Sequence, residues 1–177
     1  MLGEEGLTGP WKEPRIGSTM QGLFHLHNAK DLLEKLRHDF TRLERNSVDA
    51  YAAFDFFVTA WHLREWPYPG DDQKWRTRAS ESQLLPVCEH IAVGAKHFQP
   101  DSHRHDSVKA TSLQDSAFQP GAFQSDAFQV GRLMVELDSN AAVTLGATTM
   151  EVLELARGVL SFWDDLDKEL QGAADFL

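Results

Sequence analysis

Four polar side chains recur at helical spacing within an otherwise apolar segment: Tyr51, Asp55, Thr59 and His62. Residues three or four positions apart share one face of a helix, so these four would form a single strip. An aspartate beside a histidine can orient it for general acid–base chemistry, or the pair can supply half of a metal site. The alternative is that the strip is merely the solvated edge of a buried helix. The pattern leaves both interpretations open.

A second polar group, His90, Lys96 and His97, lies near the end of a later segment. Two histidines seven positions apart on a helix are separated by about 10 Å along its axis, too far to share one metal ion readily. One histidine would then satisfy a polar group while the other faces solvent. A cationic Lys96–His97 helix end suits the helix dipole, and the functional alternative is a site for a phosphate or another anion.

The two groups together define the candidate ligand-binding site, if the helices that carry them pack side by side. Gly94 would allow the close approach that brings Asp55 and His62 opposite Lys96 and His97. Such a cluster would act on an anionic substrate, either a phosphate compound or a nucleic acid. The sequence lacks the H-E-x-x-H spacing, so we expect no metal, and we expect no cofactor.

The usual signatures of well-marked enzyme classes are missing from the sequence. It contains no G-x-S-x-G, P-loop, G-x-G-x-x-G, C-x-x-C or EF-hand pattern. Cys88, the single cysteine, lies on the apolar stripe of its segment and is predicted to be a small core residue. No catalytic residue can be assigned on this basis, and whether the chain is an enzyme stays open.

Composition indicates one globular domain in the cytoplasm. The 177 residues are 42% hydrophobic and 25% charged, which is typical of a folded domain. The formal net charge of -10 repels nucleic-acid phosphates and disfavours nucleic acid as a partner. The most apolar segment, residues 50–63, is too short to cross a bilayer, and no signal peptide is evident. A lone cysteine is compatible with a reducing compartment.

Hydrophobic periodicity predicts four helices. The first covers residues 29–45 with Asn28 as its N-cap, and the second follows Ser47 as N-cap and ends before Pro67. Because apolar residues surround most of the second helix, it should form the centre of a bundle. The third helix is predicted at residues 83–98. Its expected buried stripe is Leu84, Cys88, Ile91, Ala95 and Phe98.

The fourth helix should begin at a capping box, Thr148-x-x-Glu151, and continue to about residue 170, with an unexplained acidic end. Residues 71–82 are predicted to form a loop that carries a basic and aromatic cluster. The cluster consists of Lys74, Trp75, Arg76 and Arg78.

Strands are expected in the second half of the chain. Residues 106–113 give a weak strand signal, and residues 131–138 and 141–145 alternate as the two strands of a hairpin turning at Ser139 and Asn140. The predicted fold class is therefore α+β and mostly α, a helical bundle with a small antiparallel sheet inserted before the C-terminal helix. Residues 23–177 would form this single domain, preceded by an extended arm at residues 1–22.

An Ala-Phe-Gln triplet occurs three times between residues 117 and 129. Phe118, Phe123 and Phe128 are thus candidates for contact with a protein partner or a second copy of the chain. The favoured hypothesis is a binding or protein-interaction domain that is not catalytic. The alternative is a ligand-binding domain or enzyme that uses the Asp/His/Lys cluster between the second and third helices.

The segments FDFFVTAWHLREW (residues 54–66) and LLPVCEHIAVGAKHF (residues 84–98) resemble a little-characterised family of small bacterial and phage proteins. The resemblance covers about half of the chain and implies no known activity. The Lys-His helix end is also similar, more remotely, to the HEPN superfamily, which implies a helical fold and a link to nucleic-acid defence. HEPN ribonucleases use an arginine that is followed, after four to six intervening residues, by a histidine. No such pair occurs here, so that activity does not carry over.

Overall fold

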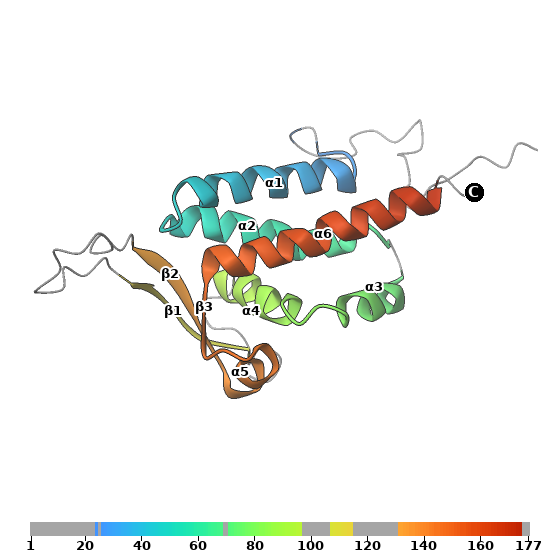
Figure 1. Ribbon diagram of the computed structural model, residues 1–177. Coiled ribbons are helices and arrows are strands. Elements are labelled where there is room, and N and C mark those ends of the chain that lie inside the picture. The colour runs from blue at the N-terminus through green and yellow to red at the C-terminus, as the bar shows by residue number, and fades with distance from the viewer. Residues whose placement is uncertain (1–23, 25, 69–70, 97–106, 115–130, 175–177) are drawn as a thin grey trace, which may run out of the picture.

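The computed structural model describes residues 24, 26–68, 71–96, 107–114 and 131–174 (Figure 1). In these ranges the chain forms six α-helices, one short 3-10 helix and a three-stranded antiparallel sheet. The predicted fold class, mostly helical α+β, is confirmed. The sheet and α5 lie at one end of the helical body, and the C-terminal end of α6 lies at the other. The predicted arm, residues 1–22, is outside the described residues.

The first helix, α1 (Ala29–Arg45), has the bounds that the sequence predicts. The side chain of Asn28 accepts a hydrogen bond from the backbone N–H of Asp31 at 3.0 Å, as expected of an N-cap. The leucines of the predicted apolar stripe are buried, and the half-buried Phe40 packs on Phe56 with ring centroids 6.0 Å apart. Local signals therefore suffice to specify this helix.

The second helix, α2 (Ala50–His62), is continued by the 3-10 helix η1 (Leu63–Glu65). Its N-cap is Asp49, whose carboxylate accepts from the N–H groups of Tyr51 and Ala52. The predicted cap, Ser47, was therefore wrong by two residues, because the aspartate can accept from two free N–H groups of the first turn. As predicted, α2 is central, since it packs against α1, α4 and α6.

Residues 71–82, predicted to be a loop, contain the helix α3 (Asp72–Ala79). The side chain of Asp71 caps it by accepting from the N–H of Lys74 at 3.0 Å. Trp75 is buried, and its ring is parallel to that of Trp163 in α6, with centroids 5.4 Å apart. The loop prediction failed because tertiary anchoring holds a short polar helix that lacks an apolar stripe of its own.

The helix α4 (Leu85–Lys96) lies within the predicted range of residues 83–98. Its buried side chains differ from the predicted stripe, because Ala95 is exposed, Leu84 and Ile91 are only partly buried, and Phe98 lies outside the described residues. The helix packs against both α2 and α6, so it buries a wider face than a single stripe. The buried residues are Leu85, Val87, Cys88, His90 and Ala92.

The sheet has the order β1 (Val108–Gln114), β2 (Arg132–Leu137) and β3 (Thr149–Glu151), all antiparallel. The predicted hairpin was right in its first strand and wrong in its second, since α5 (Ser139–Leu145) replaces a strand at residues 141–145. The side chain of Asp138 caps α5 by accepting from the N–H of Ala141 at 2.7 Å.

Gly146 ends α5 in the left-handed conformation, with φ of 71°, which glycine adopts without strain. The last helix, α6 (Val152–Ala174), begins only after β3. The predicted capping box at Thr148 and Glu151 was therefore wrong, because Thr149–Glu151 pairs with β2 instead.

The acidic end of α6 contacts basic residues of two other helices. Arg37 of α1 donates to Asp164 through Nε at 3.0 Å and Nη2 at 2.7 Å, and Arg78 of α3 donates to Glu169 at 2.7 Å. Burial alone would lower the pKa of Arg37, but its hydrogen bonds to Asp164 and Glu34 raise that pKa above its ordinary value. These ion pairs give the acidic end its structural role, which is to hold α1 and α3 against α6.

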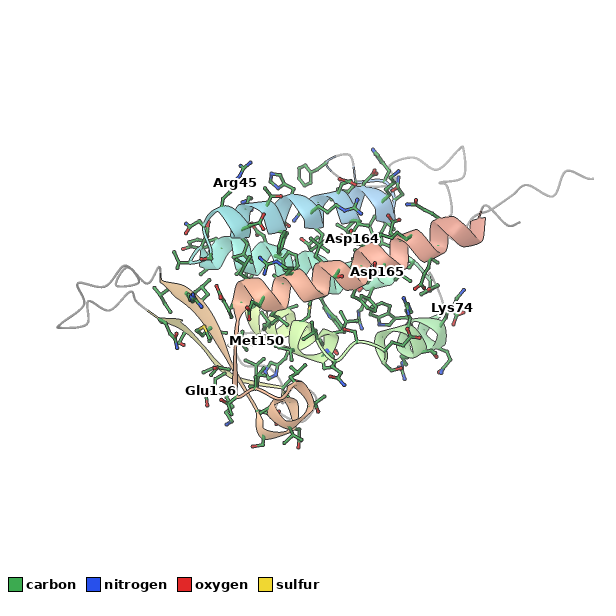
Figure 2. The ribbon with its side chains drawn as sticks, viewed as in Figure 1. Arg45, Lys74, Glu136, Met150, Asp164 and Asp165 are labelled. Carbon is green, nitrogen blue, oxygen red and sulfur yellow. The ribbon has the colours of Figure 1, made fainter. Side chains whose placement is uncertain are left out.

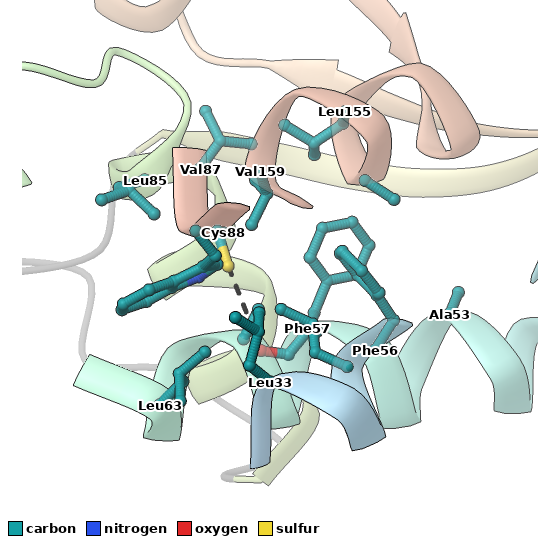
Figure 3. Close-up of a cluster of buried hydrophobic side chains, with 14 of the residues drawn as sticks. Leu33, Ala53, Phe56, Phe57, Leu63, Leu85, Val87, Cys88, Leu155 and Val159 are labelled. Atoms are coloured by element: carbon teal, nitrogen blue, oxygen red, sulfur yellow. Dashed lines mark hydrogen bonds between the residues drawn. The ribbon is translucent and has the colours of Figure 1, made fainter. Parts of the chain in front are cut away.

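The main hydrophobic core lies between α1, α2, α4 and α6. Phe56 and Phe57 form an edge-to-face pair with centroids 5.2 Å apart, and both are fully buried. Cys88 packs with them and with Val159 of α6 (Figure 3). This core confirms that α2 and α4 lie side by side at the centre of the molecule.

Candidate functional site

The polar strip of α2 faces α1, and its two central residues are bonded there. Asp55 accepts a hydrogen bond from Arg42 at 2.6 Å. The hydroxyl of Thr59 donates to the buried Asp39 at 3.0 Å and accepts from Lys35 at 2.7 Å. Asp55 and Thr59 therefore join α2 to α1. The predicted site required them to face α4, and they do not. The hydrogen bond that Arg42 donates to Asp55 is the main reason that the pKa of Arg42 is raised.

Tyr51 and His62, at the two ends of the strip, take no part in these hydrogen bonds between α1 and α2. Tyr51 is 83% exposed at the first turn of α2. His62 is partly exposed at the last turn, where its Nδ1 lies 3.7 Å from Glu65 of η1. The four residues thus share one side of α2, as predicted, without forming one site.

His90 is buried on α4, and its Nδ1 accepts a hydrogen bond from the backbone N–H of Val108 at 3.0 Å. This bond ties α4 to the first residue of β1. The interpretation that one histidine of the pair satisfies a polar group therefore holds for His90. The side chain of Lys96 and the whole of His97 lie outside the described residues, so the other half of the predicted site is not placed.

Cys88 is a core residue, as predicted. Its side chain is fully buried, and Sγ lies 4.0 Å from the carbonyl oxygen of Phe57, to which the thiol can donate weakly (Figure 3). Burial raises the pKa of the Cys88 thiol well above its ordinary value, with a smaller contribution from Glu89. A thiol that stays protonated and inaccessible is a poor nucleophile.

A different part of the molecule contains a cavity of about 740 Å³. It lies where the end of α2 and η1 meet α3 and the first turns of α4, and we call it the α3–α4 cavity. Figure 2 shows Lys74 of α3 at the end of the molecule away from Glu136 and Met150. The lining residues are Trp61, Arg64, Glu65, Tyr68, Asp72, Trp75, Arg76, Ala79, Ser80, Leu85, Pro86 and Glu89.

Aromatic rings in the cavity lining hold cations of the protein itself. The guanidinium carbon of Arg64 lies 3.9 Å from the ring centroid of Trp61, and Nζ of Lys74 lies 4.7 Å from that of Tyr68. Burial raises the pKa of Tyr68 above its ordinary value, while Arg78 lowers it and Glu169 raises it further. The phenol therefore stays protonated near neutral pH and can act as a hydrogen-bond donor.

Four charged residues of the lining make no ion pair with any residue that the structure describes: Arg64, Asp72, Arg76 and Glu89. Arg64 and Glu89 are half-buried. The Nε atom of Arg64 is buried and has no hydrogen-bond partner in the described part of the chain. A stacked guanidinium keeps the donors along its edge available, so the cavity can bind polar groups as well as apolar ones.

The sites predicted from the sequence do not include this cavity. The predicted basic and aromatic cluster contains Trp75 and Arg76 of the lining, but no predicted site contains Trp61 or Arg64. Trp61 and Arg64 are three positions apart, a spacing that brings two side chains together on a helix. This spacing could have predicted the cation–π contact between them. No sequence pattern predicts that three separate segments meet at the α3–α4 cavity.

Metal ligands and membrane spans are not evident in the described ranges. No cluster of three or more His, Cys, Asp or Glu side chains there is arranged to hold a metal ion. None of the described helices combines the length and the apolar character needed to span a bilayer.

Comparison with family models, with curated proteins and with solved structures found no significant match. The resemblance to small phage and HEPN-type proteins therefore stays a prediction.

Proposed function

We propose that this chain is a binding domain without catalytic activity, and that a small molecule occupies the α3–α4 cavity. The α3–α4 cavity is the observation that supports this proposal. Its volume of about 740 Å³ falls in the range of about 300–1,000 Å³ that is typical of ligand pockets. Such pockets combine aromatic walls with a few polar groups, and here Trp61 and Trp75 accompany charged residues that have no described ion-pair partner.

The bonding of the polar residues supports a binding role over a catalytic one. Asp55 and Thr59 stabilise the contact of α2 with α1, and His90 stabilises the contact of α4 with β1. Cys88 is buried and protonated. These groups hold the fold together, which is a sufficient reason for their types and positions.

The domain acts in the cytoplasm and also contacts protein, most simply a second copy of itself. Phe118, Phe123 and Phe128, which lie outside the described residues, are the contact candidates, because three phenylalanines recur at intervals of five. The net charge of -10 disfavours nucleic acid as the partner. The single cysteine suits a reducing compartment.

The cavity proposal is tested by filling the cavity. Ser80 is exposed and lines the cavity, so Ser80→Trp should obstruct it while leaving the core intact. Ser161→Trp places the same side chain on an exposed position of α6, outside the cavity lining, and is the matched control. Thermal unfolding of the full chain is measured for all three proteins across a set of soluble metabolites.

We expect at least one metabolite to raise the unfolding temperature of the original chain and of Ser161→Trp by several degrees, and to leave Ser80→Trp unchanged. A ligand present at one hundred times its Kd adds about 2.7 kcal/mol, or roughly 5–10 °C for a chain of this size. The proposal fails if no compound stabilises the original chain, or if Ser80→Trp is stabilised equally.

A further inference from the structure

Two half-buried charges of opposite sign line the α3–α4 cavity without touching each other. Arg64 comes from η1 and Glu89 from α4, and no ion pair within 4.0 Å joins them or connects either one to another described residue. The buried Asp39 shows the contrasting case, since Lys35 lies 2.5 Å from it and Arg42 lies 3.7 Å from it. The cavity therefore presents a separated positive and negative group to whatever enters it.

Arg64 supplies the cavity with a guanidinium that lies over an aromatic ring. Its guanidinium is stacked 3.9 Å from the centroid of Trp61, which restricts the side chain and leaves edge N–H groups for a planar, bidentate partner. Arg76 adds a second guanidinium to the lining. A rigid, partly desolvated arginine loses less freedom on binding than a free one.

Glu89 and Asp72 supply carboxylates to the same lining. The aromatic rings do not bind an ammonium group, because Arg64 covers Trp61 and Lys74 covers Tyr68. The carboxylates remain the groups that can accept hydrogen bonds from a ligand cation.

The lining carries charged groups of both signs. Three carboxylates (Glu65, Asp72 and Glu89) and two guanidinium groups (Arg64 and Arg76) surround the cavity. A pure anion would leave the three carboxylates without a partner, and a pure cation would leave the two guanidinium groups without one. A molecule that carries both charges satisfies both sets.

We infer that the α3–α4 cavity binds a small zwitterion, a free amino acid or short peptide with an apolar side chain, its carboxylate at Arg64 and its ammonium group at Glu89. The apolar side chain packs against Trp75, Leu85 and Pro86 of the lining. This inference rests on the proposed binding function and names its ligand class.

The test compares blocked and unblocked forms of two parent probes, L-phenylalanine and the dipeptide phenylalanylphenylalanine, by isothermal titration calorimetry on the full chain. N-acetylation removes the positive charge, and C-terminal amidation removes the negative charge. We expect at least one parent to bind about tenfold more tightly than either of its blocked forms, since each lost charge-assisted contact removes about that much affinity. The dipeptide and the free amino acid distinguish the two sources of the same chemistry.

Two variants assign the contacts. Glu89→Gln should weaken the parent about tenfold and leave the acetylated form unchanged, whereas Arg64→Gln should weaken the parent and leave the amidated form unchanged. Glu154→Gln and Arg45→Gln alter exposed residues outside the cavity lining and should bind like the original chain. The comparison of blocked probes on the original chain stands even if a variant fails to fold.

The inference is overturned if a blocked form binds as tightly as its parent, or if neither parent binds. In the second case the metabolite screen separates the two proposals. A different compound that stabilises the original chain but not Ser80→Trp would leave the binding function in place and reject only the ligand class. If no compound binds, both proposals are rejected.

Discussion

Trp75 of α3 and Trp163 of α6 stack with their ring centroids 5.4 Å apart and their planes 5° from parallel. Trp75 is also a wall of the α3–α4 cavity. The stack attaches a short polar helix to α6, and Arg78 reinforces this contact by donating to Glu169. The position of α3, and with it the shape of the cavity, therefore depends on the contacts of Trp75 and Arg78 with α6.

Trp75→Ala should destabilise the fold by about 3–5 kcal/mol, the usual cost of removing a buried tryptophan side chain. Urea unfolding followed by circular dichroism measures the change in free energy of unfolding. Tyr51→Ala, at a side chain that is 83% exposed, should change that free energy by no more than about 0.5 kcal/mol. A loss below about 1 kcal/mol for Trp75→Ala would show that α3 does not depend on the stack.

Two aspartates at the contact between α1 and α2 should differ in importance. Asp39→Ala leaves the buried hydroxyl of Thr59 without the carboxylate to which it donates, so we expect a loss of about 1–3 kcal/mol. Asp55→Ala breaks a pair with Arg42 in which both side chains are more than a third exposed, so the expected loss is below about 1 kcal/mol. Chemical unfolding of both variants decides the order, and an equal or larger loss for Asp55→Ala would contradict it.

Stability should fall in alkaline solution because of Cys88. Burial raises the pKa of its thiol above the ordinary value of 9.0, so the unfolded chain loses this proton at a lower pH than the folded chain. The contribution of the protonated thiol to the free energy of unfolding is complete below pH 9 and is lost as the pH rises. The free energy of unfolding then falls with a slope that approaches about 1.4 kcal/mol per pH unit.

Unfolding free energies between pH 8 and 10.5 should therefore decline more steeply for the original chain than for Cys88→Ala. The variant removes the titrating group, while every other ionisable residue is shared by the two proteins. Parallel curves for the two proteins would show that the thiol titrates equally in the folded and unfolded states.

The repeated phenylalanines provide a test of self-association. The chain has a mass of 20.0 kDa, and light scattering should give a larger mass in solution for the original protein. Replacing Phe118, Phe123 and Phe128 together by serine should return the mass to that of one chain. Phe24→Ser, at a phenylalanine that is 91% exposed, serves as the control and should keep the larger mass. A single-chain mass for the original protein would refute self-association through these residues.

The parts of the fold that local chemistry determines could be predicted from the sequence. Asn28 and the leucine stripe that follows it specify α1 without help from the rest of the chain. The apolar coat of the segment after Asp49 likewise places α2 at the centre. The burial of Cys88 follows from its place among apolar neighbours.

Part of the remainder depends on contacts between distant segments, and part depends on helix caps that compete with a strand-like pattern. The helix α3 needs Trp163, which lies 88 positions after Trp75 in the sequence. Alternating residues after Asp138 resemble a strand, yet the capping by Asp138 and the left-handed Gly146 favour the short helix α5. The polar strip was predicted correctly as a strip, but only the fold shows that Arg42 and Lys35 of α1 face it.

The most direct test of the binding function is a crystal structure of the full chain with a compound that raises its unfolding temperature. We expect electron density for that compound between η1, α3 and α4, in contact with Arg64, Trp75 and Glu89. Density for the compound on any other surface, with the α3–α4 cavity holding only water, would contradict this expectation.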